Sequence, residues 1–213
     1  MLGGEINSTD DCMPSSGIGQ GDGSCAIGTA GWADQPVQRR LMVMRLLREH
    51  IASQSSQLAA ACSPHAGRTR RESLVAEVLP LADACQFLQS HARRILRPQR
   101  FGRRSGPLWL GALSGRIERR PWGRVLVVGP SNYPLLLPGV QVVQALVAGN
   151  EVIVKPGRGG GPAMIALASL LAKSGLPPDI FTVLPEAVSS VDDALQAGVN
   201  KVVLTGSLAA GKA

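Results

Sequence analysis

Aromatic residues are scarce in this chain: three Trp, three Phe and one Tyr make up 3% of 213 residues, against 45% hydrophobic residues overall. The core must therefore consist mainly of Val, Leu, Ala and Ile, which is typical of a parallel sheet covered by helices. No stretch approaches the roughly 18 uninterrupted apolar residues of a membrane span, so we expect no membrane segment. No Lys or Arg precedes Arg39, which argues against a secretory signal.

Cysteine and histidine are also few, with four and three residues respectively. The cysteines show neither close pairing nor metal-ligand spacing, so we expect a reducing compartment, the cytoplasm, and no metal site. No histidine has a partner at ligand spacing, which favours surface roles for all three. The residues are Cys12, Cys25, Cys62 and Cys85, and His50, His65 and His91.

The net charge of +7 is distributed unevenly. Residues 1–34 hold five acids and no base, residues 35–120 hold sixteen arginines against five acids, and residues 121–213 are nearly neutral. The basic middle segment could suggest nucleic acid. It lacks interleaved aromatic residues and any recognisable reading motif, so we expect a solvated or subunit-facing surface and no nucleic-acid partner.

The chain before residue 123 divides into three segments by composition. Residues 1–34 are rich in Gly, Ser, Asp and Thr without a sustained period, which predicts a disordered tail outside the core. Residues 35–106 have apolar residues at helical spacing and form a helical lead-in. Residues 107–122 are predicted to form an extended arm outside the main sheet. Such an arm usually pairs with something else, so we expect an oligomerisation role.

Two helices are predicted within the lead-in. The first begins near Val37 and is expected to stop before Pro64, with a loop after it. The second spans about Arg71 to Leu96 and has a continuous apolar stripe, with Pro80 as the place where it could bend. Residues 97–106 then form a basic linker that contains Pro and Gly.

Residues 123–213 alternate between short Val-rich runs and helical segments. The order β-α-β-α-β-α-β demands parallel strands with right-handed crossovers. We therefore expect the α/β class, as an incomplete Rossmann-like parallel sheet flanked by helices. The predicted strands are Arg124–Val128, Glu151–Lys155, Ile180–Leu184 and Lys201–Leu204, and the predicted helices lie between Pro134 and Gly149, at Ala163–Lys173 and at Val191–Ala197.

Polar residues follow several of these strands, at the end where α/β proteins usually bind ligands. Asn132 lies between a strand and a helix, so its carboxamide could point into a cleft or could cap the helix. Lys155 ends a buried strand, where a cation is costly unless something uses it, or it lies just outside the sheet. Gly206 and Ser207 follow the last strand, where backbone N–H groups can meet a pyrophosphate.

Two glycine-rich stretches match nucleotide-binding loops only in part. Residues 206–212 have the sequence GSLAAGK and satisfy the Gly-x4-Gly-Lys pattern. The next residue is Ala213, which lacks the hydroxyl that holds magnesium, so a phosphate-loop nucleotide binder is a remote alternative. The glycines at 159–161 match no dinucleotide fingerprint and are expected to open the next helix.

Five short motifs in order make a resemblance to a known family specific. They are Gly129–Pro134 (GPSNYP), Ala148–Asn150 (AGN), Val154–Pro156 (VKP), Gly175–Pro177 (GLP) and Leu204–Ser207 (LTGS). Each motif alone is a weak signal, but their order and distances together are strong. The chain resembles the amino-terminal, cofactor-binding half of the aldehyde dehydrogenase superfamily, firmly over residues 107–213 and loosely over 37–106.

The resemblance implies oxidation of an aldehyde by NAD or NADP through a covalent cysteine adduct. An acyl-CoA-forming or reductive direction is equally compatible. It implies that Asn132 donates a hydrogen bond to the oxygen that becomes negative when a thiolate attacks the aldehyde, an interaction worth roughly 3–4 kcal/mol. It implies that Lys155 binds the ribose hydroxyls on the adenine side. The further cofactor-binding residues that it implies are Pro130, Ser131, Arg158, Gly206 and Ser207.

Position 158 bears on the choice between NAD and NADP. Relatives that prefer NAD often have an acid three residues after the matching lysine, where it binds the ribose and repels a 2′-phosphate. This chain has Arg158 there, and a guanidinium can pair bidentately with phosphate. We therefore expect tolerance of NADP or a preference for it.

Other departures from the family limit what the chain can do. Ser131 stands where relatives commonly have Trp, and the glutamate base and cysteine nucleophile of the family lie beyond the Thr-Gly-Ser motif. Without a thiolate there is no adduct and no hydride to pass on, so we expect no turnover by these 213 residues alone. Two alternatives stay open, an inactive cofactor-binding or assembly module and a truncated reading frame. The full-length protein is expected to form a homo-oligomer and to act on a small aldehyde that these residues do not identify.

Overall fold

The computed structural model describes residues 31–101, 109, 114–208 and 211. Most of the predicted tail and parts of the predicted linker and arm lie outside these residues. None of the described helices is both long and apolar enough to cross a membrane.

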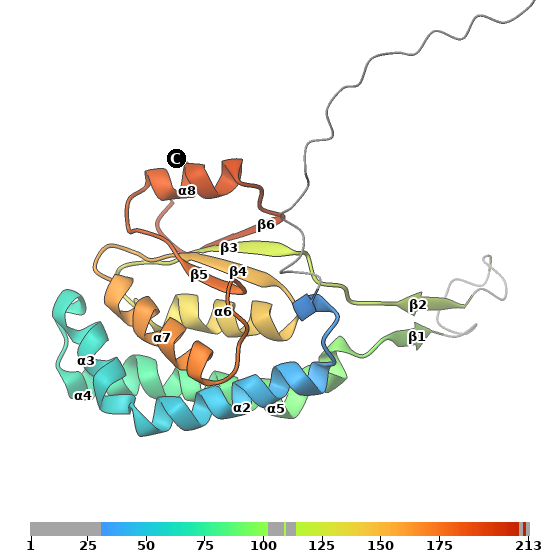
Figure 1. The fold of residues 1–213 in the computed structure, drawn as a ribbon, viewed down its shortest axis with the longest axis horizontal. Coiled ribbons are helices and arrows are strands. Elements are labelled where there is room, and N and C mark those ends of the chain that lie inside the picture. The colour runs from blue at the N-terminus through green and yellow to red at the C-terminus, as the bar shows by residue number, and fades with distance from the viewer. Residues whose placement is uncertain (1–30, 102–108, 110–113, 209–210, 212–213) are drawn as a thin grey trace, which may run out of the picture.

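A four-stranded parallel sheet forms the centre of the described chain (Figure 1). Its strands are β3 (Arg124–Val128), β4 (Glu151–Lys155), β5 (Phe181–Val183) and β6 (Lys201–Leu204), in the spatial order β5-β4-β3-β6. The α/β class and the parallel sheet are confirmed. The expected bounds of β3, β4 and β6 match as well, because Val-rich runs bounded by turn residues define each strand.

Helices cover the two faces of the sheet unequally (Figure 1). The helices α6 (Leu136–Val147) and α7 (Gly161–Lys173) lie on one face, and the short helix α8 (Ser189–Gln196) lies on the other. Val125 and Val127 point into the larger core, whereas Leu126 of the same strand joins a smaller cluster with Ile153 and Ala194 of α8. This alternation is the two-residue period of a strand buried on both faces.

The helical lead-in adds a further layer beneath α6 and α7 (Figure 1). It consists of α2 (Val37–Ser53), α3 (Ser55–Ala66), α4 (Arg70–Ser73), a π-helical turn η1 (Leu74–Val78) and α5 (Leu79–Leu96). The expected apolar stripe of the second helix is buried at Val78, Leu81, Cys85, Leu88 and Ala92. The π turn ends two residues before Pro80 and provides the irregularity that proline favours there.

The predicted end of the first helix before Pro64 is wrong. After an interruption at Gln54, helix continues through Pro64 to Ala66 and stops at Gly67, whose φ of 64° is left-handed. A proline in the last turn removes one backbone hydrogen bond, whereas glycine in the left-handed conformation closes a helix at little steric cost.

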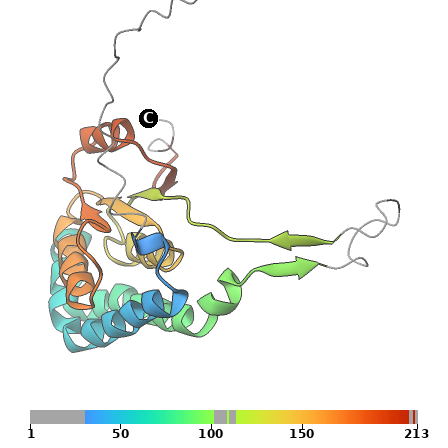
Figure 2. The same cartoon turned by 45° about the vertical axis from the view of Figure 1, so that its right-hand side comes forward.

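The two strands β1 (Gln99–Phe101) and β2 (Gly115–Ile117) pair antiparallel and project away from the body (Figure 2). The expected arm therefore has a partner strand within the same chain, inside the segment predicted to be a linker. The sequence did not reveal β1, because a three-residue strand that contains two polar residues has no periodic signature.

The expectation that the whole predicted tail lies outside the core is wrong at Trp32. Trp32 is 2% exposed, and its indole Nε1 donates to the carbonyl oxygen of Leu146 in α6 over 3.0 Å. The buried Arg40 donates to the carbonyl of the adjacent Ala33 over 3.1 Å and fixes this entry into α2. Burial lowers the pKa of Arg40 below its ordinary value. Trp32 thus anchors the segment before α2 against α6.

We predict that Trp32→Ala lowers the free energy of unfolding by about 3–5 kcal/mol and Trp32→Phe by less, because both create a cavity and remove a buried hydrogen bond. Chemical denaturation followed by circular dichroism measures this. The matched control is Trp109→Phe, since Trp109 is 82% exposed. Equal effects of Trp32→Phe and Trp109→Phe would contradict the anchoring role.

Candidate functional site

The parallel order brings four loops to one edge of the sheet. These loops follow β3, β4, β5 and β6, whose carboxyl ends all face the same way. Backbone hydrogen bonds extend the pairing just past the strands, from Gly129 N to Lys155 O over 2.9 Å and from Thr205 N to Val128 O over 3.0 Å. The predicted site residues therefore share this carboxyl edge.

The loops after β3 and β4 are in direct backbone contact. A Cβ atom added to Gly157 would lie 2.3 Å from the carbonyl carbon of Pro130 and 2.5 Å from the amide nitrogen of Ser131. Only glycine allows such an approach. Gly157 is buried beneath this contact, and Ser131 remains exposed. The arrangement ties the position of the Pro130–Ser131 peptide to the turn that follows Lys155.

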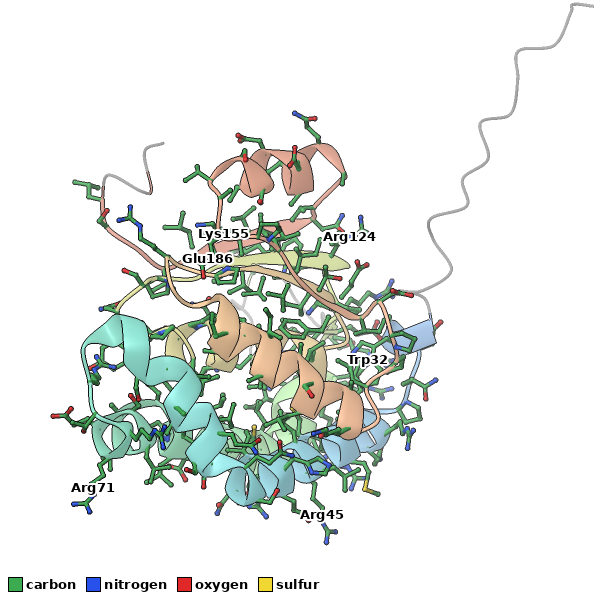
Figure 3. All side chains as sticks on the ribbon, turned by 60° about the vertical axis from the view of Figure 1, so that its left-hand side comes forward. Trp32, Arg45, Arg71, Arg124, Lys155 and Glu186 are labelled. Carbon is green, nitrogen blue, oxygen red and sulfur yellow. The ribbon has the colours of Figure 1, made fainter. Side chains whose placement is uncertain are left out.

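Lys155 occupies the buried end of β4 and is 9% exposed. Its ammonium group makes no hydrogen bond or ion pair with the part of the chain that the structure describes. In Figure 3, Lys155 and Glu186 lie at one end of the sheet, and Arg124 lies at the opposite end. Most of the side chain is buried along β4, and its ammonium group has donors to offer at the sheet edge, so this position suits a ligand that supplies acceptors. Arg158, three residues on, is exposed.

The loop after β6 is held by a side chain from α6. The amide Nε2 of Gln141 donates to the hydroxyl Oγ1 of Thr205 over 2.7 Å, while the Oε1 atom of Gln141 is buried without a partner in the described chain. Gly206 and Ser207 follow Thr205 and are exposed at the same edge. Lys212 of the Gly-x4-Gly-Lys pattern lies outside the described residues, so that alternative stays untested.

Asn132 does not cap α6. The helix begins at Leu136, its N-cap Leu135 provides no side-chain bond, and Asn132 is exposed without a hydrogen bond to the described residues. The cap comes from Glu77, whose Oε2 accepts from Leu135 N over 2.7 Å and from Leu136 N over 3.3 Å. The carboxamide of Asn132 is therefore not used by the fold around it.

Glu186 is a second acid at this edge that the sequence reasoning missed. It follows β5, and its two carboxylate oxygens accept from Gly159 N over 2.7 Å and from Gly161 N over 2.8 Å. The contact fixes the glycine turn that opens α7, as expected of a carboxylate at a helix N-terminus. A signal existed in the sequence, because Glu186 is a charged residue just past a predicted strand.

The two described cysteines are buried thiols away from this edge. Both are free, Cys62 in α3 and Cys85 in α5. The pKa of each thiol is raised to about 12, mainly by burial; for Cys62 the charge of Glu77 contributes in the same sense and Arg68 in the opposite sense. Neither thiol is suited to nucleophilic attack at neutral pH. Among the described residues, no group of His, Cys, Asp and Glu could hold a metal ion.

Comparison with curated proteins identifies relatives of this chain. It is 31% identical over 182 residues to 4,4'-diapolycopene aldehyde oxidase of Methylomonas sp, which covers 85% of this chain and 34% of the relative. It has the same identity and coverage with the "putative succinate-semialdehyde dehydrogenase (NADP+)" of Mycolicibacterium smegmatis. The chain thus spans about a third of the length of the curated relatives that it matches.

Comparison with solved structures confirms the fold. The NADP-dependent glyceraldehyde-3-phosphate dehydrogenase of Bacillus halodurans, solved with NADP, superposes with a TM-score of 0.77 at 24% identity. The match covers 86% of this chain and 39% of that one.

The family model described as the aldehyde dehydrogenase family matches residues 25–213, which include the whole sheet and the lead-in helices. The match thus spans all five motifs as well as the layers that hold them. The chain belongs to the aldehyde dehydrogenase family.

Proposed function

We propose that this chain forms the cofactor-binding part of an NAD(P)-dependent enzyme that oxidises an aldehyde to an acid or an acyl derivative. The observation that supports this most directly is Lys155 at the carboxyl edge, whose side chain is mostly buried yet makes no hydrogen bond or ion pair with the described residues, beside loops that end in exposed backbone and small polar residues. Such an edge suits a ligand that offers both hydroxyl acceptors and a pyrophosphate. When bound, the nicotinamide accepts hydride from the substrate.

Each residue at the edge has a distinct proposed part. Lys155 would donate to the ribose hydroxyls on the adenine side, while the exposed Gly206 and Ser207 would meet the pyrophosphate. The Pro130–Ser131 peptide, fixed by its contact with Gly157, would form a wall of the cofactor groove. Asn132, which does not cap α6, would donate a hydrogen bond to the developing oxyanion.

Arg158 favours NADP in this proposal. Its guanidinium is exposed directly after the Lys155 turn, where it can reach a phosphate on the ribose. The name of the Mycolicibacterium relative and the Bacillus complex both specify NADP, which supports the same choice.

We also propose where the nucleophile lies and how the chain assembles. The buried thiols lack the ionisation that a nucleophile needs, so the nucleophile would come from outside the described residues. The same observation favours a second candidate function, an NAD(P)-binding or assembly module without turnover of its own. The β1–β2 ribbon would serve a homo-oligomer, and two free buried thiols are consistent with the cytoplasm.

Replacing Lys155 tests the cofactor site directly. We predict that Lys155→Met weakens binding of NADP to the 213-residue chain by about ten- to a hundredfold, because charge-assisted hydrogen bonds to the ligand are lost. The unfolding midpoint should change little, because the ammonium group makes no hydrogen bond or ion pair with the described residues.

Isothermal titration and thermal unfolding provide these two readouts, and the exposed Lys173 is the matched control as Lys173→Met. Wild-type chain that binds neither NADP nor NAD, or an unchanged affinity in Lys155→Met, would overturn the proposed site.

Replacing Arg158 tests the cofactor preference. We predict that Arg158→Gln weakens NADP binding about tenfold and leaves NAD binding unchanged, because only the 2′-phosphate contacts the guanidinium. Arg71→Gln is the control, since Arg71 is exposed on the helical layer far from Lys155 in Figure 3. The preference is refuted if the wild type binds NAD as tightly as NADP.

The buried thiols predict a pH dependence. Below about pH 9 the thiols of Cys62 and Cys85 are protonated in both folded and unfolded chains; above it the unfolded thiols ionise first. The free energy of unfolding should therefore fall as pH rises from 9 towards 12.

Chemical denaturation at several pH values between 9 and 12 measures this fall, in a variant in which Cys12 and Cys25 are replaced by Ser. A thiol reagent at pH 8.5 should label neither remaining thiol in the native chain and both in denaturant. Rapid native labelling of Cys62 would show an accessible thiolate, contrary to this account.

A further inference from the structure

We propose that Glu77 is a positioning residue, which holds the turn that presents Asn132 at the carboxyl edge. The inference rests on the function proposed for Asn132, but its geometry is independent of that function. Glu77 comes from the helical lead-in, 58 residues before the first amide that it binds. A side chain of the outer layer therefore organises a loop of the cofactor-binding layer.

One carboxylate oxygen of Glu77 fixes the start of α6. Glu77 is fully buried at 0% exposure, and its Oε2 accepts from the amides of Leu135 and Leu136. These are among the backbone donors that a helix leaves unsatisfied at its first turn. A negative charge there is also favoured by the helix dipole. The turn immediately after Asn132 is thereby anchored at its carboxyl side.

The other carboxylate oxygen acts on the residue next to Asn132. The Oε1 atom of Glu77 pairs with Arg68 over 3.2 Å, and the guanidinium carbon of Arg68 lies 4.1 Å from the ring centroid of Tyr133. Cation–π contact of this kind orients an aromatic ring. Glu77 thus constrains both ends of the segment between Asn132 and α6, through one direct contact and one relayed contact.

The backbone around Glu77 is itself unusual. Residues 74–78 form the π-helical turn η1, in which the amide of Leu79 bonds to the carbonyl of Leu74. An inserted residue of this kind rotates the side chains on either side of it, and such turns occur often at functional sites. Burying a carboxylate is expensive unless hydrogen bonds compensate, and here Arg68, Leu135 and Leu136 provide them.

The test uses nuclear magnetic resonance on the 213-residue chain without cofactor. Tyr133 is the only tyrosine of the sequence, so incorporation of 3-fluorotyrosine gives a single fluorine signal for this turn. Labelled asparagine reports the carboxamide of Asn132 in the same samples. We expect Glu77→Gln and Arg68→Met each to displace the fluorine signal and the Asn132 carboxamide signal of the folded chain.

Hydrogen exchange at the helix start provides a second readout. In Glu77→Gln the amides of Leu135 and Leu136 should exchange about ten- to a hundredfold faster, because they lose a charged acceptor. In Arg68→Met they should change less, since Arg68 does not touch them. Arg68 is partly exposed, so this variant keeps the test open if Glu77→Gln fails to fold.

The matched control is Glu49→Gln, which alters an exposed acid of α2 that pairs with Arg45. It should lower stability slightly and leave the signals of Tyr133 and Asn132 in place. If Glu77→Gln and Arg68→Met lower the unfolding midpoint yet also leave both signals in place, Glu77 has a structural role only and the proposal is wrong. Because no cofactor is added, failure of NAD(P) binding would not affect this result.

Discussion

The parallel pairing of β4, β3 and β6 is the constraint on which the rest of this structure depends. Parallel neighbours put every strand's carboxyl end at one edge, so loops separated by up to about eighty residues in sequence become neighbours. Gly157 then brings the backbone of the β4 loop against the Pro130–Ser131 peptide. Reversal of a strand would separate the elements of the proposed cofactor groove. A side chain added at position 157 would do the same.

The helical lead-in has more than a covering role. Trp32 reaches Leu146 across 114 residues, and Glu77 reaches Leu135 across 58. Both contacts end on the backbone of α6, the helix that directly follows the turn containing Asn132. Trp32, which precedes the lead-in, and Glu77 of the lead-in thus contact opposite ends of α6. These contacts give a physical reason for the burial of polar groups, such as the Glu77 carboxylate, in the layer beneath α6.

The parts that the sequence predicts are those governed by local pattern. The bounds of β3 and β4 follow from Val-rich runs between turn residues, and the position of the site follows from the rule that ligands bind at carboxyl ends. Glu77 could not be found in this way. Its importance comes from meeting Leu135 and Arg68 in space, and on the sequence it is an ordinary acid within an amphipathic helix. The predicted end of the first helix before Pro64 was wrong for another reason. The left-handed Gly67 determines where α3 ends.

Glu186 limits how a phosphate could bind beside Arg158. A helix N-terminus usually offers its amides to an anion, but the amides of Gly159 and Gly161 at the start of α7 already donate to the carboxylate of Glu186. An added 2′-phosphate could not use those donors without displacing Glu186, and the carboxylate's charge would oppose its approach. In the proposed complex the guanidinium of Arg158 must therefore supply the attraction. Selectivity for NADP would then depend on one exposed side chain set against a fixed acid, so a substitution at position 158 would change the cofactor preference while the turn itself stayed intact.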